Sequence, residues 1–334
     1  MSRVAIIGAG SWGTALGLMA GRAGHEVRFW SRNPGVVEEI NRAHLNSAYL
    51  PQHLLPESIT ATCEMGEAVV GAELVLLAAP SHAARELLMS MLPFVKAEML
   101  FVSATKGIET ETGKRISEIL KDVLGEHFAP RFVCLSGPSF AQEVASGQPT
   151  AVVAASQSIE DSMLVQSALS FQNLRIYTNT DVVGTELGGS LKNVMALAAG
   201  MVCGLGLGTN SIAALITRGI AEMMRLALAE GARAETLMGL AGLGDLVLTC
   251  TGSLSRNRFV GQELGKGRTL AEVLCEMREV AEGVKTTRAV KQLSGRLSVK
   301  MPITNEVHAV LYEDKSAREA MQDLMTRPLR GEFD

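Results

Sequence analysis

The sequence VAIIGAGSWG, residues 4–13, joins four apolar residues to three glycines in the pattern G-x-G-x-x-G. An apolar strand, a glycine turn and a helix in this order are typical of the phosphate-binding segment of a dinucleotide-binding fold. In that segment Gly8 permits a tight turn, Gly10 lets the backbone approach a pyrophosphate, and Gly13 lets the helix pack closely on the strand. A plain glycine-rich turn is the alternative, but the apolar run directly before the motif favours a nucleotide site.

Outward from this motif, the first half of the chain alternates short apolar runs with helical patterns. Helix-like segments separate the apolar runs at residues 12–23, 83–91, 113–124 and 159–170. Strands separated by helices indicate βαβ units, so this half is predicted to form a Rossmann-type, doubly wound, mostly parallel sheet. The predicted strands are residues 4–7, 26–30, 74–78, 99–103, 132–135, 151–155 and 174–177.

After residue 181 the alternation stops, and apolar residues recur at intervals of three and four positions. This period is that of an amphipathic helix. Two capping boxes, Thr269 with Glu272 and Ser316 with Glu319, mark expected helix starts. We therefore expect an α/β protein with two domains, a dinucleotide-binding domain in residues 1–182 and an all-α substrate-binding and catalytic domain in residues 183–334.

The composition of the 334 residues argues against several classes of function. The chain has 31 basic and 35 acidic residues, a net charge of −4 and no basic block, so no nucleic-acid partner is expected. Five cysteines without a C-x-x-C pair and six scattered histidines predict free thiols and no metal site. The longest uncharged apolar stretch, residues 194–208, is too short to span a membrane, and the strand-like start leaves no room for a signal peptide. We expect a cytoplasmic protein without integral membrane association.

The end of the second predicted strand bears on the choice of cofactor. Folds selective for NAD place an Asp or Glu there, against the ribose 2′-hydroxyl. Here residues 31–33 read Ser-Arg-Asn, and the first carboxylate after the strand is Glu38. Arg32 can pair with a 2′-phosphate, so we expect NADP to be accepted and preferred. A solvated surface arginine with no role in binding is the alternative.

Two further segments carry polar groups where predicted strands end. In VSATKG, residues 102–107, Lys106 follows the strand, and in LSGPSFA, residues 135–141, Ser139 follows a Gly-Pro turn. Ligands of open α/β sheets bind at the carboxyl ends of the strands. Both segments are therefore expected at one ligand-binding edge, although each alone would suit an ordinary loop.

The predicted helical half carries a lysine in an otherwise apolar helix. In ELGGSLKN, residues 186–193, Lys192 has Gly188 and Gly189 on the preceding turn, and the next 15 residues are uncharged. Small neighbours leave room for a ligand beside the ammonium group, whereas a surface lysine that extends to solvent is the alternative.

Two later segments of the helical half add a carboxylate and an anion-binding pattern. GLGD, residues 242–245, sets Asp245 in a glycine-rich turn. Residues 255–257 read Ser-Arg-Asn and combine a hydroxyl, a guanidinium and an amide, which together suit an anion. Read alone, such a tripeptide is an ordinary loop.

Taken together, these motifs closely resemble those of bacterial NAD(P)-dependent glycerol-3-phosphate dehydrogenases. The resemblance covers nearly the whole chain and includes EVAEG, residues 279–283. It implies reversible reduction of dihydroxyacetone phosphate to sn-glycerol 3-phosphate with NADPH or NADH, a step that supplies glycerophospholipid synthesis. It also implies a small phosphorylated substrate as the binding partner and a homodimer.

The resemblance further assigns roles to individual residues. It implies that Lys192 is the proton donor and acceptor. With the motif glycines, the expected cofactor-binding residues are Gly8, Gly10, Ser11, Trp12, Gly13, Arg32, Lys106, Ala141, Arg256, Val280 and Glu282. The expected substrate-binding residues are Lys106, Gly137, Ser139, Lys192, Asp245, Ser255, Arg256 and Asn257.

The chemistry of the expected reaction agrees with these roles. As hydride reaches the ketone carbon, negative charge develops on the carbonyl oxygen, and the Lys192 ammonium group can stabilise and protonate that oxygen. Partial burial would lower the pKa of Lys192 and make its neutral form accessible for the reverse oxidation. Asp245 is expected to orient Lys192 or a substrate hydroxyl, and Arg256 with Asn257 to hold the phosphate.

Three other functions stay open from the sequence alone. A related reductase acting on a hydroxyacid or ketopantoate would share the glycine loop and a lysine in the helical domain, but it would prefer a carboxylate substrate. A non-enzymatic dinucleotide sensor would need only the glycines of the first domain and would turn over no carbonyl compound. A lipid- or membrane-associated protein is disfavoured because the sequence shows no anchor.

Overall fold

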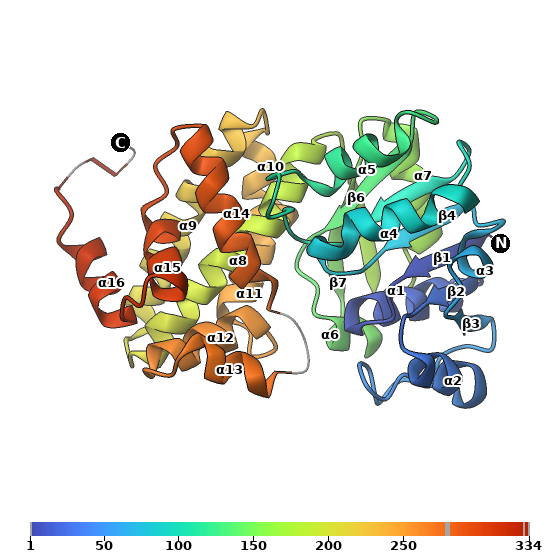
Figure 1. The fold of residues 1–334 in the computed structure, drawn as a ribbon, viewed down its shortest axis with the longest axis horizontal. Helices are drawn as coiled ribbons and strands as arrows, with labels where there is room; N and C mark the ends of the chain where they lie inside the picture. Colours follow the sequence, from blue (N-terminus) through green and yellow to red (C-terminus); the bar gives the residue numbers. More distant parts are fainter. Residues whose placement is uncertain (1, 278–280, 330, 333–334) are drawn as a thin grey trace.

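The computed structural model describes residues 2–277, 281–329 and 331–332. The molecule is elongated, with a β-sheet and its covering helices at one end and a bundle of helices at the other (Figure 1). We call residues 2–179, which contain all the strands of the described chain, the sheet part, and the described residues from 182 onward the helical part. Helix α8 (Val182–Gly204) begins where the last strand ends and runs through the helical part.

One sheet of eight strands forms the centre of the sheet part. The strands are β1 (Arg3–Ile7), β2 (Glu26–Trp30), β3 (Ile59–Thr62), β4 (Leu74–Leu77), β5 (Leu100–Ser103), β6 (Arg131–Ser136), β7 (Thr150–Ala155) and β8 (Leu174–Asn179). Their order is β3-β2-β1-β4-β5-β6-β7-β8, and all neighbours are parallel except β6 and β7. The order reverses between β1 and β4, the position at which ligands bind in folds of this kind.

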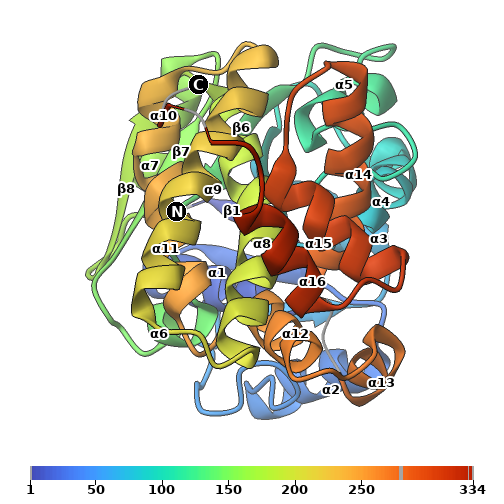
Figure 2. The ribbon, with the colours of Figure 1, turned by 90° about the vertical axis from the view of Figure 1, so that its left-hand side faces the viewer.

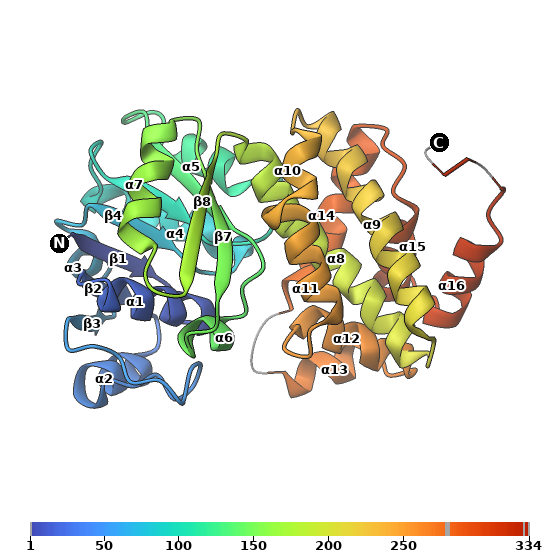
Figure 3. The ribbon, with the colours of Figure 1, turned by 180° about the vertical axis from the view of Figure 1, so that it is seen from behind.

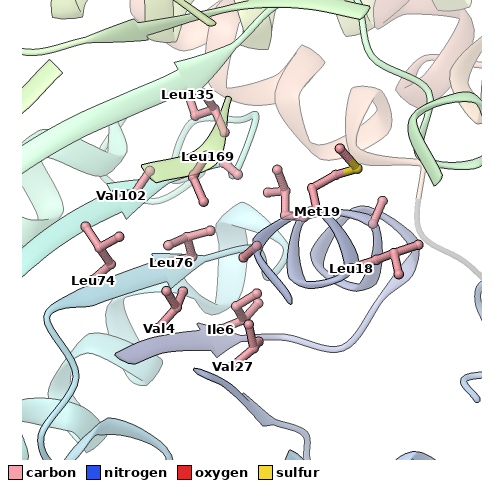
Figure 4. Packing of buried hydrophobic residues seen from close by; sticks show 14 of the residues in the cluster. Val4, Ile6, Leu18, Met19, Val27, Leu74, Leu76, Val102, Leu135 and Leu169 are labelled. Atoms are coloured by element: carbon pink, nitrogen blue, oxygen red, sulfur yellow. The ribbon is translucent and has the colours of Figure 1, made fainter. Parts of the chain in front are cut away.

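Both faces of this sheet are covered by helices and buried. Alternate residues of β1 serve the two faces: Ile6 joins the apolar cluster on one side and Ile7 the cluster on the other. Part of the first cluster is drawn in Figure 4, which shows strand residues such as Val4, Ile6 and Leu76 together with Leu18 and Met19 of the first helix. The helices of the sheet part are α1 (Ser11–Arg22), α2 (Pro34–Ala43), α3 (Met65–Val69), α4 (Ala84–Met91), α5 (Ile116–Leu124), α6 (Ala141–Ala145) and α7 (Ile159–Leu169).

Helix α8 is the centre of the helical part, with other helices packed around it (Figures 2 and 3). Its main neighbours are α9 (Thr209–Ala229), α11 (Asp245–Thr251), α12 (Arg256–Gly265) and α14 (Glu282–Arg296). The remaining α-helices are α10 (Ala234–Met238), α13 (Leu270–Glu276), α15 (Pro302–Tyr312) and α16 (Ala317–Met325), of which α16 lies at the end far from the sheet. A π-helical segment, η3 (Leu240–Gly244), leads directly into α11.

Glycines let α8 and α12 approach until their backbones touch. A Cβ on Gly200 would lie 2.0 Å from the carbonyl oxygen of Arg258, and a Cβ on Gly261 would lie 2.0 Å from that of Leu197. Among the described helices, α8 is the one long and apolar enough to cross a membrane, but 83% of its apolar window is buried inside the fold. The glycine-rich, apolar stretch of the sequence is therefore the core helix of the helical part.

The predicted fold class is confirmed, with local corrections. All seven predicted strands are present within two residues of the expected bounds, while β3 and the helices α2, α3 and α6 were not predicted. The helix expected from residue 113 begins at Ile116, because Gly113 has a positive φ of 72° and Arg115 caps the helix. Both predicted capping boxes are present, at α13 and α16.

Candidate active site

The glycine loop after β1 has the conformation that the sequence predicts. Gly8 has a φ of 114°, and a Cβ there would lie 2.9 Å from the carbonyl oxygen of Ala78. A Cβ on Gly13 would lie 2.0 Å from the carbonyl oxygen of Gly8, so helix α1 packs directly on the turn. Gly10 caps α1 and faces open space: apart from its own chain neighbours, no described atom lies within 4 Å of its Cβ position.

The residues around this loop fit a dinucleotide. Ser11 begins α1, so the open space at Gly10 lies at a helix N-terminus, where backbone N–H groups favour an anion. The indole Nε1 of Trp12 is buried and has no hydrogen-bond partner among the described residues, which leaves one donor for a ligand.

Arg32 lies after β2 in an exposed position, as predicted. It is not the sole cation of this region. Burial lowers the pKa of His82, and the nearby cations Lys285 and Arg32 lower it further. His82 belongs to the short turn η1 (Ser81–Ala83) after β4, and Lys285 belongs to α14 of the helical part. Arg32 and Lys285, from segments far apart in the chain, are thus both close enough to His82 to affect its pKa, as is the carboxylate of Glu111, which raises it.

One carboxylate joins the two lysines that the sequence analysis singles out. Lys192 Nζ, from the middle of α8, lies 2.8 Å from Asp245 Oδ1, and Lys106 Nζ, from the loop after β5, lies 2.6 Å from Asp245 Oδ2. Lys192 also donates to Thr249 Oγ1 at 2.7 Å, and Lys106 donates to the carbonyl oxygen of Gly137 at 3.0 Å. The contact between Lys106 and Asp245 thus links the sheet part to the helical part.

The charges of this cluster oppose the effect of burial. Burial lowers the pKa of Lys192 to about 8, against the attraction of Asp245. Burial alone would raise the pKa of Asp245, but the ammonium groups of Lys106 and Lys192 hold it below its usual value. Asp245 is therefore an anion at neutral pH, whereas Lys192 can gain or lose a proton near pH 8.

The loop after β6 lies beside Lys106. Gly137 has a φ of 136°, and its carbonyl oxygen accepts from both Lys106 Nζ and Ser139 Oγ, each at 3.0 Å. Ala141 is the first residue of α6, one turn further along the chain. The structure thus brings the ends of β5 and β6 together at one edge, as the parallel arrangement predicts.

The Ser255-Arg256-Asn257 segment forms the start of α12. Ser255 caps the helix, and its hydroxyl accepts from the N–H of Arg258 at 3.2 Å. Asn257 Nδ2 donates to Asn193 Oδ1 at 3.0 Å, and Asn257 Oδ1 accepts from the N–H of Gly283 at 2.9 Å. The amide of Asn257 thus ties α8, α12 and α14 together, an internal function that the sequence analysis does not foresee.

The first turn of α14 closes over the sheet part. Glu282 Oε1 accepts from the N–H of Ser81 at 3.3 Å, so α14 contacts the turn η1. Burial raises the pKa of Glu282, despite the opposing charge of Arg256 nearby. Val280, the other residue expected here, lies outside the described residues.

Comparison with known proteins identifies the chain. The family models for the N-terminus and the C-terminus of NAD-dependent glycerol-3-phosphate dehydrogenase match residues 3–162 and 181–322. The chain belongs to this family. The glycerol-3-phosphate dehydrogenase [NAD(P)+] of Koribacter versatilis is 53% identical over 98% of both chains, and that of Myxococcus xanthus is 50% identical over 99% of both. The crystal structure of glycerol-3-phosphate dehydrogenase from Coxiella burnetii has a TM-score of 0.94 and 41% identity, and it covers 98% of this chain and 99% of its own.

The family confirms the predicted oxidoreductase class and the use of NAD or NADP. We call Lys106, Lys192, Asp245 and Thr249 the central cluster. The sequence analysis did not select Thr249. Thr249 stands four residues after Asp245 on α11, so the two lie on the same face of the helix. This spacing could have pointed to Thr249 as a partner of the Asp245 site.

Proposed function

We propose that the protein catalyses the reversible reduction of dihydroxyacetone phosphate to sn-glycerol 3-phosphate, with Lys192 as the proton donor. The observation that carries this proposal is the buried contact of Lys192 with Asp245 and Thr249. Lys106 links this contact to the loops that follow β5 and β6. The family relationship supports the same reaction.

The reduced nicotinamide, when bound, supplies the hydride for the ketone carbon. As charge develops on the carbonyl oxygen, the Lys192 ammonium group donates its proton to that oxygen. Asp245 holds Lys192 in place and compensates its charge in the buried site. In the reverse direction neutral Lys192 accepts the proton of the alcohol, which a pKa of about 8 permits at mildly alkaline pH.

The substrate and the cofactor each require fixed polar groups. A phosphate dianion needs charge-assisted donors, for which Arg256 at the start of α12 and Lys106 are suited. The proposed substrate-binding residues are Lys106, Gly137, Ser139, Lys192, Asp245, Ser255, Arg256 and Asn257. The proposed cofactor-binding residues are Gly8, Gly10, Ser11, Trp12, Gly13, Arg32, Lys106, Ala141, Arg256, Val280 and Glu282.

NADPH is the proposed preferred cofactor. The support for this choice is the pair of cations Arg32 and Lys285, both close enough to lower the pKa of His82, and the lack of a carboxylate between the end of β2 and Glu38. A 2′-phosphate would be attracted to such a group, whereas a 2′-hydroxyl gains little from it. Comparison of kcat/KM for NADPH and NADH tests this preference.

We extend the proposal to the setting of the enzyme. The proposed protein is a cytoplasmic homodimer whose product supplies glycerophospholipid synthesis, with residues 1–182 and 183–334 as its two domains. The family relationship and the apolar helical half support this setting. Light scattering coupled to gel filtration measures the oligomeric state directly.

The test of the reaction is oxidation of NADPH with a panel of carbonyl substrates. Turnover with dihydroxyacetone phosphate, and none with ketopantoate or other 2-oxo acids, is the expected result. Preference for a 2-oxo acid would instead indicate a related reductase, and absence of turnover with every carbonyl compound would indicate a dinucleotide sensor.

A further inference from the structure

Glu186 of α8 forms a buried contact between the two parts of the molecule, away from the residues assigned above. Its side chain is 4% exposed. The carboxylate accepts from the N–H of Ser117 at 2.8 Å, from Ser117 Oγ at 2.5 Å and from Arg115 Nη1 at 3.3 Å. Arg115 caps α5 and Ser117 lies in its first turn, so a carboxylate from the helical part caps a helix of the sheet part.

The groups of this contact complement one another. A carboxylate at a helix N-terminus satisfies N–H groups that have no partner within the helix. Burial raises the pKa of Glu186, whereas Arg115 and Ser117 oppose that effect; Glu118 of α5 and the Cys134 thiol of β6 are the other titratable groups nearby. Removal of one partner would leave a buried charge without compensation, which is costly.

The same helix carries Lys192, six residues after Glu186. At a rise of about 1.5 Å per residue, the two side chains are separated by roughly 9 Å along the axis of α8. Between them, a Cβ on Gly189 would lie 2.6 Å from Ser136 Oγ at the end of β6. Helix α8 therefore packs closely on the end of β6 at a point between Glu186 and Lys192.

The position of α8 matters because the central cluster is built from both parts. Asp245 meets Lys192 from its own part and Lys106 from the sheet part. A shift of α8 along the sheet edge would change the distance from Lys192 to the substrate held by the loops after β5 and β6. Misplacement by about 1 Å can cost as much as 100-fold in rate.

We propose that Glu186 is a positioning residue of the reaction, because its contact with α5 fixes the position of α8 and therefore of Lys192 relative to the loops after β5 and β6. This inference rests on the proposed function, in which Lys192 donates the proton. The hydrogen-bond partners of Glu186 are Arg115 and Ser117, whereas those of Lys192 are Asp245 and Thr249, so the two side chains share no partner in the described part of the chain. The effect of Glu186 therefore acts through the helix.

The chain offers a matched control for this inference. Glu222 of α9 is also buried, at 1% exposure, and it also caps a neighbouring helix, by accepting from the N–H groups of Ile303 and Thr304 at 2.9 and 2.8 Å. Burial raises its pKa as well. Glu222 and its partners all lie in the helical part, so its loss disturbs the fold but not the joint between the two parts.

The test compares Glu186→Gln with Glu222→Gln. We expect both variants to lose thermal stability, but only Glu186→Gln to lower kcat with dihydroxyacetone phosphate, by at least about tenfold. The Kd for NADPH, measured by fluorescence, should stay within about twofold in both, because the hydrogen-bond partners of both residues lie outside the glycine loop. Equal losses of stability with unchanged kcat in Glu186→Gln would reduce Glu186 to a structural residue and overturn the proposal.

A second variant and a second readout separate this outcome from others. Ser117→Ala removes one hydrogen-bond donor to Glu186 and keeps the Glu186 carboxylate. It should also lower kcat, by a smaller factor than Glu186→Gln, and it serves as the test if Glu186→Gln does not fold.

The pH dependence of acylation of Lys192, followed by mass spectrometry, reports the pKa of this lysine without turnover. Glu186→Gln should shift that pKa and Glu222→Gln should not; an unshifted pKa contradicts the proposal. If the wild-type protein shows no turnover, the proposed function fails, and the acylation result still tests the positioning.

Discussion

Lys106 and Asp245 lie 139 positions apart in the chain, yet their side chains meet at 2.6 Å. Lys106 lies in the loop after β5, and Asp245 is the first residue of α11. Their contact therefore joins the sheet part to the helical part. Because Lys192 holds the second oxygen of the same carboxylate, Asp245 fixes the two cations relative to each other. In the proposed mechanism, the geometry of the reaction depends on this shared partner.

The first prediction concerns the pH dependence of the wild-type enzyme. In the proposed mechanism reduction needs the protonated form of Lys192, so the kcat for reduction should be constant below a pH of about 8 and fall above it. Oxidation of glycerol 3-phosphate needs the neutral form, so its kcat should rise through the same pH. Initial rates in both directions, over a pH series at saturating substrates, measure the two limbs. Limbs that run in the same direction would be inconsistent with one shared proton donor.

Replacement of Asp245 by Asn should shift the limb for reduction toward lower pH. The Asp245 carboxylate raises the pKa of Lys192, so its loss lets burial and Lys106 lower that pKa below about 8. The kcat for reduction should also fall by at least about tenfold, because Lys192 loses an orienting partner. A pH profile of Asp245→Asn that coincides with the wild-type profile would exclude this coupling.

Arg256→Ala should weaken binding of the phosphorylated substrate. Loss of a hydrogen bond to a charged group costs about 1.5–3 kcal/mol, which corresponds to a rise in KM of roughly 10- to 150-fold. Arg268→Ala is the control, since the half-buried Arg268 pairs with Glu263 of α12 and Glu276 of α13. We expect KM for dihydroxyacetone phosphate to rise in Arg256→Ala and to stay unchanged in Arg268→Ala. Equal values in the two variants would remove Arg256 from the phosphate site.

Arg32→Ala should change the choice of cofactor more than the rate. The side chain is exposed and lies beside His82 and Lys285, so its loss weakens an attraction that only the 2′-phosphate of NADPH feels. We expect kcat/KM to fall about tenfold or more with NADPH and little with NADH. An equal decrease of kcat/KM with NADPH and NADH would show that Arg32 does not distinguish the 2′-phosphate from the 2′-hydroxyl.

The contact between α8 and α12 predicts a difference between two glycines. Gly261→Ala would bring a methyl group to 2.0 Å from the carbonyl oxygen of Leu197, so the helices must separate. Overpacking of this kind costs typically about 1–3 kcal/mol of unfolding free energy. Gly295→Ala on α14 meets open space and should instead stabilise the helix by about 0.5–1 kcal/mol. Urea unfolding of both variants measures the two values, and a neutral Gly261→Ala would contradict the close packing.

Much of this fold could be predicted because its strands are short apolar runs with clear helical patterns between them. β3 escaped prediction because it is a four-residue strand, Ile59–Thr62, at the edge of the sheet, and its burial alternates. Helix α2 was hidden by Pro34 and Gly35 in its first turn, residues that in a sequence indicate a loop.

Individual residues of the candidate site could be predicted from the sequence, but the contacts between them could not. Lys106, Ser139 and Lys192 could be selected because they follow strand ends or interrupt an apolar helix. No local pattern shows that Lys106 shares the carboxylate of Asp245, since that contact depends on how the two parts pack. The same is true of Glu186, whose partners on α5 lie about 70 positions earlier in the chain.

The most direct test of the account is single-turnover reduction of dihydroxyacetone phosphate by Lys192→Ala with NADPH bound. The account predicts a rate lower by roughly 10²–10⁴-fold than that of the wild type, because the proton donor is absent. NADPH should still bind with nearly unchanged affinity, since the glycine loop is intact. A wild-type rate in this variant would contradict the assignment of Lys192 and, with it, the proposed mechanism.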